Sequence, residues 1–139
     1  MRSECFLDTN VLIYAAAGKK DDSFKYAIAY RLVSETQFGL STQVLAEFYH
    51  NARRKFAVTL PLQDLHDWIE SLAEFPMIDI DFDLVRMAIT HSERYNIAYW
   101  DAALVAACER LDAPILYTED LNHRQTYGSV TVLNPFRIN

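Results

Sequence analysis

Short apolar runs alternate with longer amphipathic stretches, and this alternation constrains the fold more than any other feature of the sequence. The runs have the length of buried strands and comprise residues 5–7, 38–41, 77–80, 114–117 and 130–133. Apolar side chains between them recur with helical spacing, which predicts helices over residues 11–17, 23–35, 42–55, 61–72, 81–95 and 102–108. Strands that alternate with helices are typical of a parallel sheet covered on both faces. We therefore predict an α/β fold of three layers (αβα), with helices on both sides of a mainly parallel sheet.

Local features predict how three of these helices begin, end or face the core. Gly18 follows the first helix, and we expect it to close that helix in a left-handed conformation. Pro61 is expected at the first position of the fourth helix, which proline favours. In the fifth helix, Phe82, Val85 and Ile89 have the spacing of one apolar stripe, the side of a helix that normally faces a core.

The length of 139 residues is typical of one domain, and we expect a single domain over residues 1–139. The net charge of −6 by itself argues against a protein that holds nucleic acid by neutralising its phosphates. The acidic excess fits a solubilising surface. It equally fits carboxylates that hold divalent cations, which then contact the phosphates, and composition alone does not choose between the two.

The N-terminus does not resemble a signal peptide, because Glu4 and Asp8 interrupt the early apolar run. Apolar stretches also fall short of the roughly 20 residues of a membrane span. We therefore expect a cytoplasmic protein without a membrane partner. Cys5 and Cys108 lie in apolar stretches and lack the spacing of a metal or redox motif, so we expect both to be reduced core residues.

Four acidic residues are expected at one edge of the predicted sheet. Asp8 directly follows the first strand, Asp120 follows the fourth, and Asp101 opens the helix that precedes the fourth strand. Glu47 lies near the start of the helix after the second strand and can face the same edge, where open parallel sheets bind their ligands. Like charges about 4 Å apart repel by roughly 4 kcal/mol at an effective dielectric of about 20. Four converging carboxylates therefore favour a hard cation such as Mg²⁺ or Mn²⁺.

Each of these acids also has a simpler interpretation. Asp8 and Asp101 can cap the helices that follow them, Glu47 can lie on a solvated helix face, and Asp120 can be an ordinary loop residue. Their spacing is not diagnostic, because the four converge only if the fold is right. The residues alone thus leave open both a cation site and a set of structural carboxylates.

Four segments around these acids resemble, in order, the motifs of the PIN domain, and in particular those of the VapC-like toxins of bacterial and archaeal toxin–antitoxin pairs. They are residues 7–12 (LDTNVL), 41–48 (STQVLAEF), 100–104 (WDAAL) and 116–121 (LYTEDL). Each motif alone is weak. Their order, their separations and the chain length all match, so the resemblance covers essentially the whole chain.

The resemblance implies a PIN-like fold and a metal-dependent endoribonuclease with Mg²⁺ or Mn²⁺ as cofactor. Its catalytic and metal-binding quartet would be Asp8, Glu47, Asp101 and Asp120. Asn10 and Thr118 would be supporting polar groups near the metal or the scissile phosphate. A metal-activated water would attack the phosphate, and a carboxylate could orient that water as general base.

The same resemblance implies three partners: an RNA substrate, a VapB-type antitoxin and a second copy of the chain, forming a homodimer. The antitoxin would bury apolar surface of the toxin and direct a basic side chain toward the acidic site. The helix over residues 23–35 is a candidate for this contact through Tyr26, Ile28, Tyr30 and Leu32, although these residues could belong to the core.

Basic residues near the acidic edge are candidates for contacts with RNA phosphates. They are Arg53, Arg54 and Lys55 at the end of the Glu47 helix, and Arg124. The first three can equally stabilise a helix C-terminus.

The segment after the fourth acid departs from the family pattern. Many relatives carry a glycine there, where this chain has residues 123–125 (HRQ). This leaves the placement of Asp120 open, with the neighbouring Glu119 as the alternative acid.

Two other classes of protein stay open. A PIN fold that only binds RNA or protein, with weak catalysis or none, would carry the same motifs. A receiver-type phosphoacceptor domain is also a small α/β domain with Asp residues at strand ends. It needs a lysine after its last strand and an acidic pair at its first, whereas residues 134–136 are NPF and Asp8 has no adjacent acid. These features disfavour the receiver.

Overall fold

The computed structural model describes residues 3–56 and 59–137, and its centre is a six-stranded sheet of order β3-β2-β1-β4-β6-β5. The parallel strands are β1 (Cys5–Leu7), β2 (Phe38–Ser41), β3 (Met77–Ile78), β4 (Ile115–Tyr117) and β6 (Val130–Leu133). Among the described strands only β5 (Thr126–Tyr127) is antiparallel, paired with β6. The predicted α/β fold with a mainly parallel sheet is confirmed.

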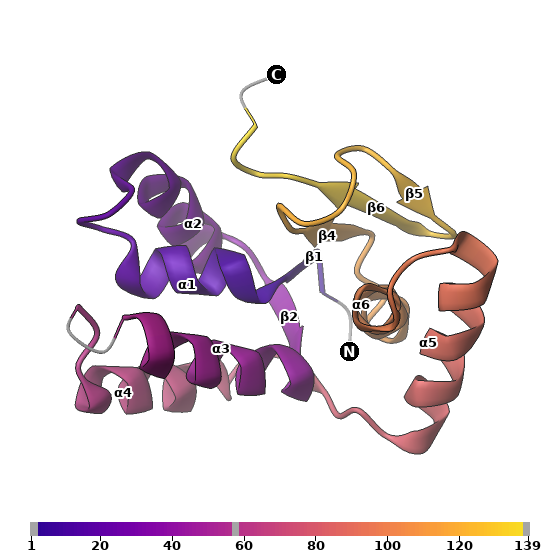
Figure 1. Ribbon diagram of the computed structural model, residues 1–139, viewed down its shortest axis with the longest axis horizontal. Helices are drawn as coiled ribbons and strands as arrows, with labels where there is room; N and C mark the ends of the chain where they lie inside the picture. Colours follow the sequence, from indigo (N-terminus) through magenta and orange to yellow (C-terminus); the bar gives the residue numbers. More distant parts are fainter. Residues whose placement is uncertain (1–2, 57–58, 138–139) are drawn as a thin grey trace.

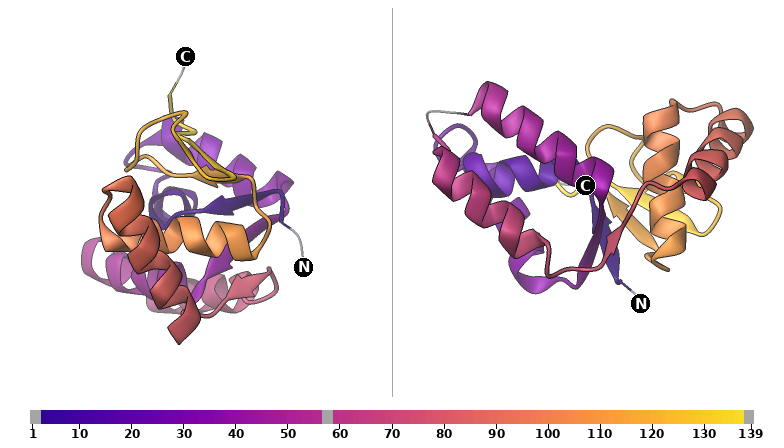
Figure 2. Two further views of the ribbon diagram at one scale, coloured as in Figure 1. Left: turned by 90° about the vertical axis from the view of Figure 1, so that its right-hand side faces the viewer. Right: turned by 90° about the horizontal axis from the view of Figure 1, so that it is seen from below.

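Helices cover the sheet on two sides (Figure 1). On one side lie α1 (Thr9–Ala17), α2 (Ser23–Glu35), α3 (Thr42–Lys55) and α4 (Leu62–Leu72). On the other side, α5 (Phe82–Tyr95) packs along α6 (Tyr99–Arg110), and the views of Figure 2 show the same separation. Within the described part of the chain, no helix is both long enough and apolar enough to cross a bilayer.

Helix α6 is the most deeply buried helix of the fold. Residues 102–108 are all buried, as their apolar composition predicts, and the helix contacts β2, β4 and β6. Cys108 lies in this segment and Cys5 in β1, both as free, buried thiols. Burial raises the pKa of each thiol, so both stay protonated, and their prediction as reduced core residues is confirmed.

The chain reverses its direction of travel across the sheet at β1, which has β2 on one side and β4 on the other. Ligands of open α/β sheets bind outside the carboxyl ends of the strands at such a switch point. Asp8 follows β1 here and its backbone N–H donates to the carbonyl of Tyr117 at 3.0 Å, at the end of β4. The fold thus sets the first and the last acidic motifs side by side.

Helix ends differ from the predictions in several places. The largest difference is at α6, which runs over Tyr99–Arg110 and not over residues 102–108, and α5 begins at Phe82 and not at residue 81. α1 begins at Thr9, two residues earlier than expected, because the Asp8 side chain caps it. Gly18 closes α1 with φ −84°, so the predicted left-handed conformation is wrong. A Cβ on Gly18 would lie 2.6 Å from the carbonyl oxygen of Tyr14, and this close approach is what favours glycine. Pro61 precedes α4 as its N-cap residue and is not its first helical residue.

The predicted apolar stripe of α5 does not face the core. Phe82 is 69% exposed and Ile89 47% exposed, whereas Leu84 and Ala88 are buried. α5 packs against the alanine-rich α6, and the small side chain of Ala88 permits that close approach. The structure therefore corrects the expected face of this helix.

Besides a start of β4 one residue later than expected, at Ile115, the strand predictions needed two corrections. The third strand ends at Ile78, because the backbone N–H of Ile80 donates to the Thr42 hydroxyl at 3.2 Å instead of continuing the sheet. β5 was not predicted: it has two residues and is followed by Gly128 at φ 60°.

Candidate active site

The two carboxylate oxygens of Asp8 make different contacts, one with the helix that follows and one with polar side chains at the edge of the sheet. Its side chain is 6% exposed. Oδ1 accepts the backbone N–H of Thr9 at 2.6 Å, which caps α1, as one of the alternatives for this residue proposes. Oδ2 accepts the Thr118 hydroxyl at 2.7 Å and the Asn10 amide at 3.3 Å. The capping contact thus leaves Oδ2 directed toward the switch point.

Asn10 and Thr118 connect Asp8 to Asp120. The Asn10 amide nitrogen lies 3.3 Å from Thr118 Oγ1 and 3.2 Å from Asp120 Oδ2, in addition to its contact with Asp8. The fully buried Thr118 hydroxyl donates to Asp8 and accepts the backbone N–H of Asp120 at 3.1 Å. Two polar side chains therefore hold two carboxylates from different strands in one network.

Glu47 faces the same pocket from α3. A pocket of about 270 Å³ is lined by Asp8, Asn10, Glu47 and Asp120, among other residues. Glu47 is exposed, and its Oε1 accepts the Gln43 amide at 3.2 Å.

Asp101 lies in the first turn of α6 and is half-buried. The N-cap residue of α6 is Ala98, and among the described residues no side chain caps this helix. The alternative that Asp101 serves as an N-cap is therefore wrong. Asp101 does not line the pocket formed by the other three acids, but it lies near enough to Asp120 to be affected by its charge.

The electrostatics of the site link all four acids. Burial, with smaller contributions from the charges of Asp120 and Glu47, raises the pKa of Asp8 to about 6, against the hydrogen bonds from Thr118 and Thr9. Burial also raises the pKa of Asp101, with a further contribution from Asp120. The charges of Asp120 and Glu47 thus disfavour ionisation of Asp8, and the charge of Asp120 disfavours ionisation of Asp101, as expected for carboxylates without a compensating cation.

The donor set fits a hard divalent cation, although it does not enclose one as the side chains stand. Among residues 3–56 and 59–137, no three His, Cys, Asp or Glu side chains form a ready metal-binding group. The groups that face the pocket are carboxylate, amide and hydroxyl oxygens, which Mg²⁺ and Mn²⁺ prefer. The Asn10 Oδ1 atom is buried and has no hydrogen-bond partner within this described part. A cation would relieve both the mutual repulsion of the acids and this unpaired acceptor.

Glu119, the alternative to Asp120, also lines the carboxylate pocket, but its carboxylate is paired with a lysine and a tyrosine. Its Oε2 lies 2.9 Å from Lys25 Nζ, and its Oε1 accepts the Tyr14 hydroxyl at 3.0 Å. The Glu119 hydrogen bond is the main reason that the pKa of Lys25 is raised. Sequence reasoning missed Lys25 and Tyr14, because no local motif marks a pair of charges 94 residues apart.

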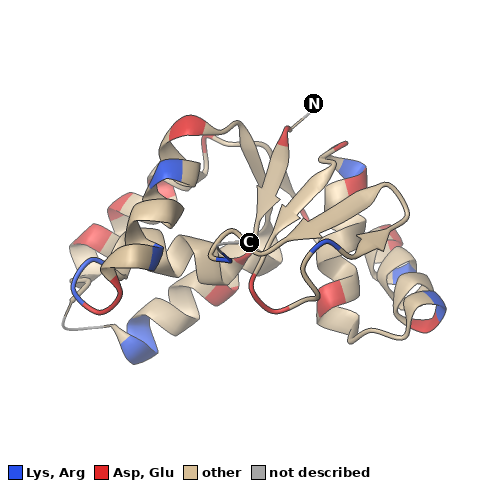
Figure 3. Cartoon of the chain, turned by 90° about the horizontal axis from the view of Figure 1, so that it is seen from above, with Lys and Arg blue, Asp and Glu red and all other residues tan. Residues whose placement is uncertain are grey.

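Basic residues lie at the rim of the site in unequal positions. Lys55 lines the carboxylate pocket. Arg53 and Arg54 are exposed in the last turn of α3, at the end that carries the blue segment in Figure 3. Arg124 is exposed and adopts φ 70°, the left-handed region that glycine occupies without strain. This conformation explains physically why glycine suits the segment after the fourth acid.

The side chains of α2 divide between surface and core. Tyr30 is 48% and Phe24 51% exposed. Ile28 and Leu32 are half-buried and pack against the core, and Tyr26 is half-buried beside Tyr30. A partner that contacts this helix therefore has Phe24 and Tyr30 most fully available.

One protein-family model, described as the PIN domain, matches this chain over residues 5–129. No curated protein is significantly similar to it in sequence.

Solved structures share the fold at low sequence identity. A chain of a toxin–antitoxin complex from Klebsiella pneumoniae is 19% identical, with TM-score 0.69, and the match covers 96% of this chain and 99% of that one. VapC20 of Mycobacterium tuberculosis, a toxin that cleaves the sarcin–ricin loop, is 17% identical with TM-score 0.63, covering 84% and 89%. A chain of VapBC2 from Rickettsia felis, bound to promoter DNA, is 16% identical with TM-score 0.61, covering 92% and 96%.

Proposed function

Because this chain belongs to the PIN domain family, we propose that it is a metal-dependent endoribonuclease and the toxin of a VapBC-type toxin–antitoxin pair. The observation that carries the proposal is the network at the switch point. Asp8 and Asp120, which follow different strands, share the Asn10 amide, and Glu47 faces them across one pocket. Structural carboxylates that served only as helix caps would have no reason to converge in this way.

Asp8, Glu47, Asp101 and Asp120 would hold Mg²⁺ or Mn²⁺ in this proposal. When bound, such an ion supplies a water of lowered pKa and stabilises negative charge on the phosphate and the leaving oxygen.

The chain's own residues position the reacting groups. Thr118 and Asn10 fix the orientation of Asp8 and Asp120 by donating to their inner oxygens. A carboxylate oxygen that does not bind the cation would orient the attacking water and accept its proton. Glu47 is the best placed for this role through its second oxygen, because it is exposed and flanks the pocket on a helix.

The proposal also accounts for the net charge of −6. Cations at the acidic site would bind the phosphate that is cleaved, and the basic residues at the rim would bind its neighbours. Lys55 lines the pocket, while Arg53, Arg54 and Arg124 are exposed, do not line it and would make longer-range contacts. Binding through so few basic residues should weaken only moderately with salt.

RNA cleavage tests the proposal directly. We expect the protein to cleave RNA in Mg²⁺ or Mn²⁺, and to lose this activity in EDTA and on the substitution Asp101→Asn. Asp67→Asn, an exposed residue on α4 outside the site, is the matched control and should retain activity. Cleavage that persisted in EDTA or in Asp101→Asn would contradict the metal mechanism. RNA binding without cleavage by the wild type would favour the alternative of a non-catalytic PIN module.

The toxin role predicts an effect in cells. Expression of the chain alone should arrest growth, and Asp8→Asn should relieve the arrest.

The partner would be a VapB-type antitoxin, in line with the toxin–antitoxin complexes that share this fold. We place its contact on α2 at Phe24 and Tyr30, beside a groove between α2 and α4 that Tyr30, Val33 and Trp68 help to line. Unchanged antitoxin affinity after Phe24→Asp and Tyr30→Asp would exclude this face.

A further inference from the structure

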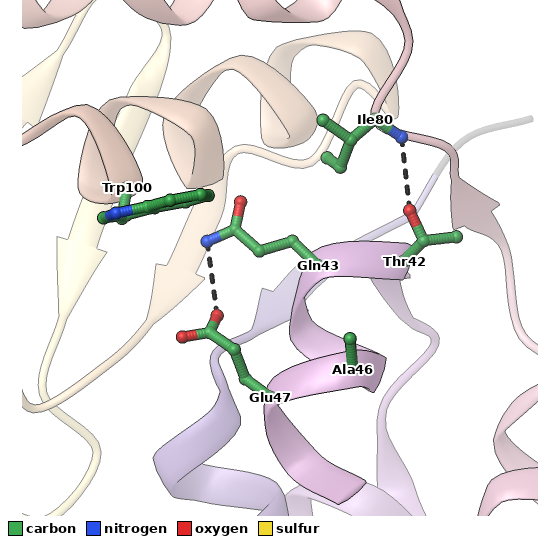
Figure 4. Close-up of a pocket in the computed structure, with 6 residues that line it drawn as sticks. All are labelled: Thr42, Gln43, Ala46, Glu47, Ile80 and Trp100. Carbon is green, nitrogen blue, oxygen red and sulfur yellow. Dashed lines mark hydrogen bonds between the residues drawn. The ribbon is translucent and has the colours of Figure 1, made fainter. Parts of the chain in front are cut away.

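A second pocket opens beside the candidate active site, between the start of α3 and the start of α6 (Figure 4). Its volume is about 490 Å³, and its lining residues are Thr42, Gln43, Ala46, Glu47, Ile80 and Trp100. Glu47 lines both this pocket and the carboxylate pocket. A molecule bound at the carboxylates can therefore extend into the second pocket around this one side chain.

Trp100 forms an aromatic wall of this pocket. It is 63% exposed, which is unusual for so large an apolar ring. Tyr99 packs against it edge to face, with ring centroids 4.9 Å apart and planes at 79°. This contact supports the indole from the helix side. Exposed aromatic rings next to a phosphate-binding site are the usual platforms on which unpaired nucleobases stack.

Gln43 lies between Trp100 and Glu47 (Figure 4) and offers an unused acceptor. Its amide nitrogen donates to Glu47 Oε1 at 3.2 Å. The opposite orientation would set the amide oxygen against a carboxylate, so the observed one is favoured. The amide oxygen of Gln43, Oε1, is consequently turned away from Glu47. It is covered and has no hydrogen-bond partner in the part of the chain that the structure describes. A covered acceptor without a donor is unfavourable, and an N–H group entering the pocket would satisfy it.

We propose that this pocket binds a nucleobase of the RNA strand beside the phosphate that is cleaved, stacked on Trp100 with an N–H edge toward Gln43 Oε1. That oxygen is covered in the structure, so the proposal requires the side chains around it to move as the base enters. The inference rests on the proposed ribonuclease function and adds the place at which the protein contacts the bases of its substrate.

Continuity with the acidic site favours RNA over a protein occupant. Asp101 directly follows Trp100 in the chain, and Glu47 stands between the two pockets. Because Glu47 lines both pockets, a strand whose phosphate reaches the carboxylates can place a neighbouring base against Trp100. A protein segment has no phosphate to bring to cations at the carboxylates, whereas an RNA strand would use both pockets at once.

Indole fluorescence can report on this stacking without any cleavage. The chain has two tryptophans, so the Trp68→Phe variant retains Trp100 as its single indole. Asp8→Asn in the same protein prevents cleavage and lowers the negative charge of the site. We would titrate this variant in Mg²⁺ with octanucleotides of riboadenosine, ribocytidine or ribouridine, and with an abasic phosphodiester oligomer of equal length.

The base-bearing oligomers should quench Trp100 fluorescence saturably, whereas the abasic oligomer should not. In the Asp8→Asn background, Trp100→Ala should weaken binding of the base-bearing oligomers about 5- to 150-fold, the range of one stacked base, and Trp100→Phe should restore most of it. Gln43→Leu should change the ranking of the three base-bearing oligomers, because it removes the acceptor but keeps the volume. Thr90→Ala, on the exposed side of α5, is the control and should behave as its parent.

Failure of this inference and failure of the proposed function give different results. If wild-type protein cleaves RNA and Trp100→Ala cleaves it with unchanged kcat and KM, the base site is wrong and the nuclease stands. Stacking without cleavage by the wild type would leave the base site and remove the nuclease. Equal quenching by the abasic oligomer would overturn the base site. A change of molar mass in Trp100→Ala without a change in RNA affinity would overturn it in favour of a protein contact.

Discussion

Asp8 and Glu119 are both carboxylates at the ends of neighbouring strands, yet their surroundings differ. Glu119 has a lysine at 2.9 Å and a tyrosine hydroxyl at 3.0 Å, which stabilise its charge. Asp8 is more deeply buried, has other acids near it, and has a pKa raised to about 6. The strand-end position of Asp8 could be predicted from sequence. The pairing of Glu119 could not, because it depends on how α2 packs.

The raised pKa of Asp8 predicts how Asp8→Asn changes stability in metal-free protein. Because the folded pKa of about 6 lies above the ordinary 3.8, the contribution of Asp8 is most favourable below about pH 4 and is lost as pH rises through about 6. A shift of this size corresponds to about 3 kcal/mol. Asparagine loses an acceptor for Thr118, so we expect a net gain of about 1–2 kcal/mol at pH 8.

Urea unfolding in EDTA measures this effect. The difference between Asp8→Asn and wild type should be largest near pH 8 and should shrink toward pH 4. Mg²⁺ should stabilise the wild type more than the variant. A variant no more stable than wild type at pH 8 would show that Asp8 is not electrostatically strained.

The backbone conformation of Arg124 predicts an effect on stability that can be separated from the effect of its charge on RNA binding. Its φ of 70° is unfavourable for any residue with a Cβ, by roughly 1–2 kcal/mol. Arg124→Gly and Arg124→Ala remove the same charge, but only glycine removes the strain. After allowance for the greater freedom of glycine in the unfolded chain, Arg124→Gly should be about 0.5–1 kcal/mol more stable than Arg124→Ala in thermal unfolding, while the two should bind RNA equally.

At the scale of elements, the positions of the helices and strands were predicted well, and the faces that they bury against one another were predicted less well. The bounds of α2 and α3 match the predictions, because each has a side-chain cap at its start and a clear helical pattern. The face of α5 was wrong, because Ala88 packs on α6 while the larger Phe82 does not. β5 was missed, since two residues are too few for a pattern. Hydrophobic size and spacing predict that an element exists, but its neighbours decide which side is buried.

Lys25 and Glu119 join two elements, and a double-mutant cycle should detect the link. Lys25 lies on α2 and Glu119 in the loop after β4 that carries Asp120, with side chains 29% and 23% exposed. This partial burial places the pair between exposed ion pairs and buried ones. We expect Lys25→Met and Glu119→Gln to show a coupling energy of about 1–2 kcal/mol in urea unfolding.

Lys20→Met provides the control for this cycle. Lys20 is exposed in the turn before α2, so it should show no coupling to Glu119→Gln. If Lys25→Met also gave no coupling, the ion pair would not fix the loop of Asp120 to α2.

At the scale of the whole molecule, the site depends on the order of strands more than on any one motif. Strand order around β1 brings residues more than 100 positions apart in the chain within hydrogen-bond distance, as between Asn10 and Asp120. Alternation of strands and helices predicted that the acids would meet at one edge. It did not predict that Asp101 would stand outside the pocket lined by the other three acids, because that depends on where α6 begins.

The exposed face of α5 is a candidate contact surface for the homodimer that the sequence analysis expects. Phe82 and Ile89 are seven residues apart, so they lie on one stripe of the helix, two turns from each other. Large apolar side chains grouped on one exposed stripe favour a contact surface, and the resemblance to VapC-like toxins implies a homodimer. We propose that α5 contributes to that dimer.

Ile89→Glu should therefore dissociate the protein into monomers at micromolar concentration, because each copy would place a buried charge in a twofold contact. Thr90→Glu adds the same charge at an adjacent exposed position that lies about 100° around the helix, and it should remain dimeric. Light scattering after size-exclusion chromatography measures the molar mass of each. Both variants should unfold at nearly the wild-type denaturant concentration when monomeric, since neither side chain is buried in the single chain. A wild-type protein that is monomeric at high concentration, or an Ile89→Glu variant that stays dimeric, would exclude α5 as the dimer contact.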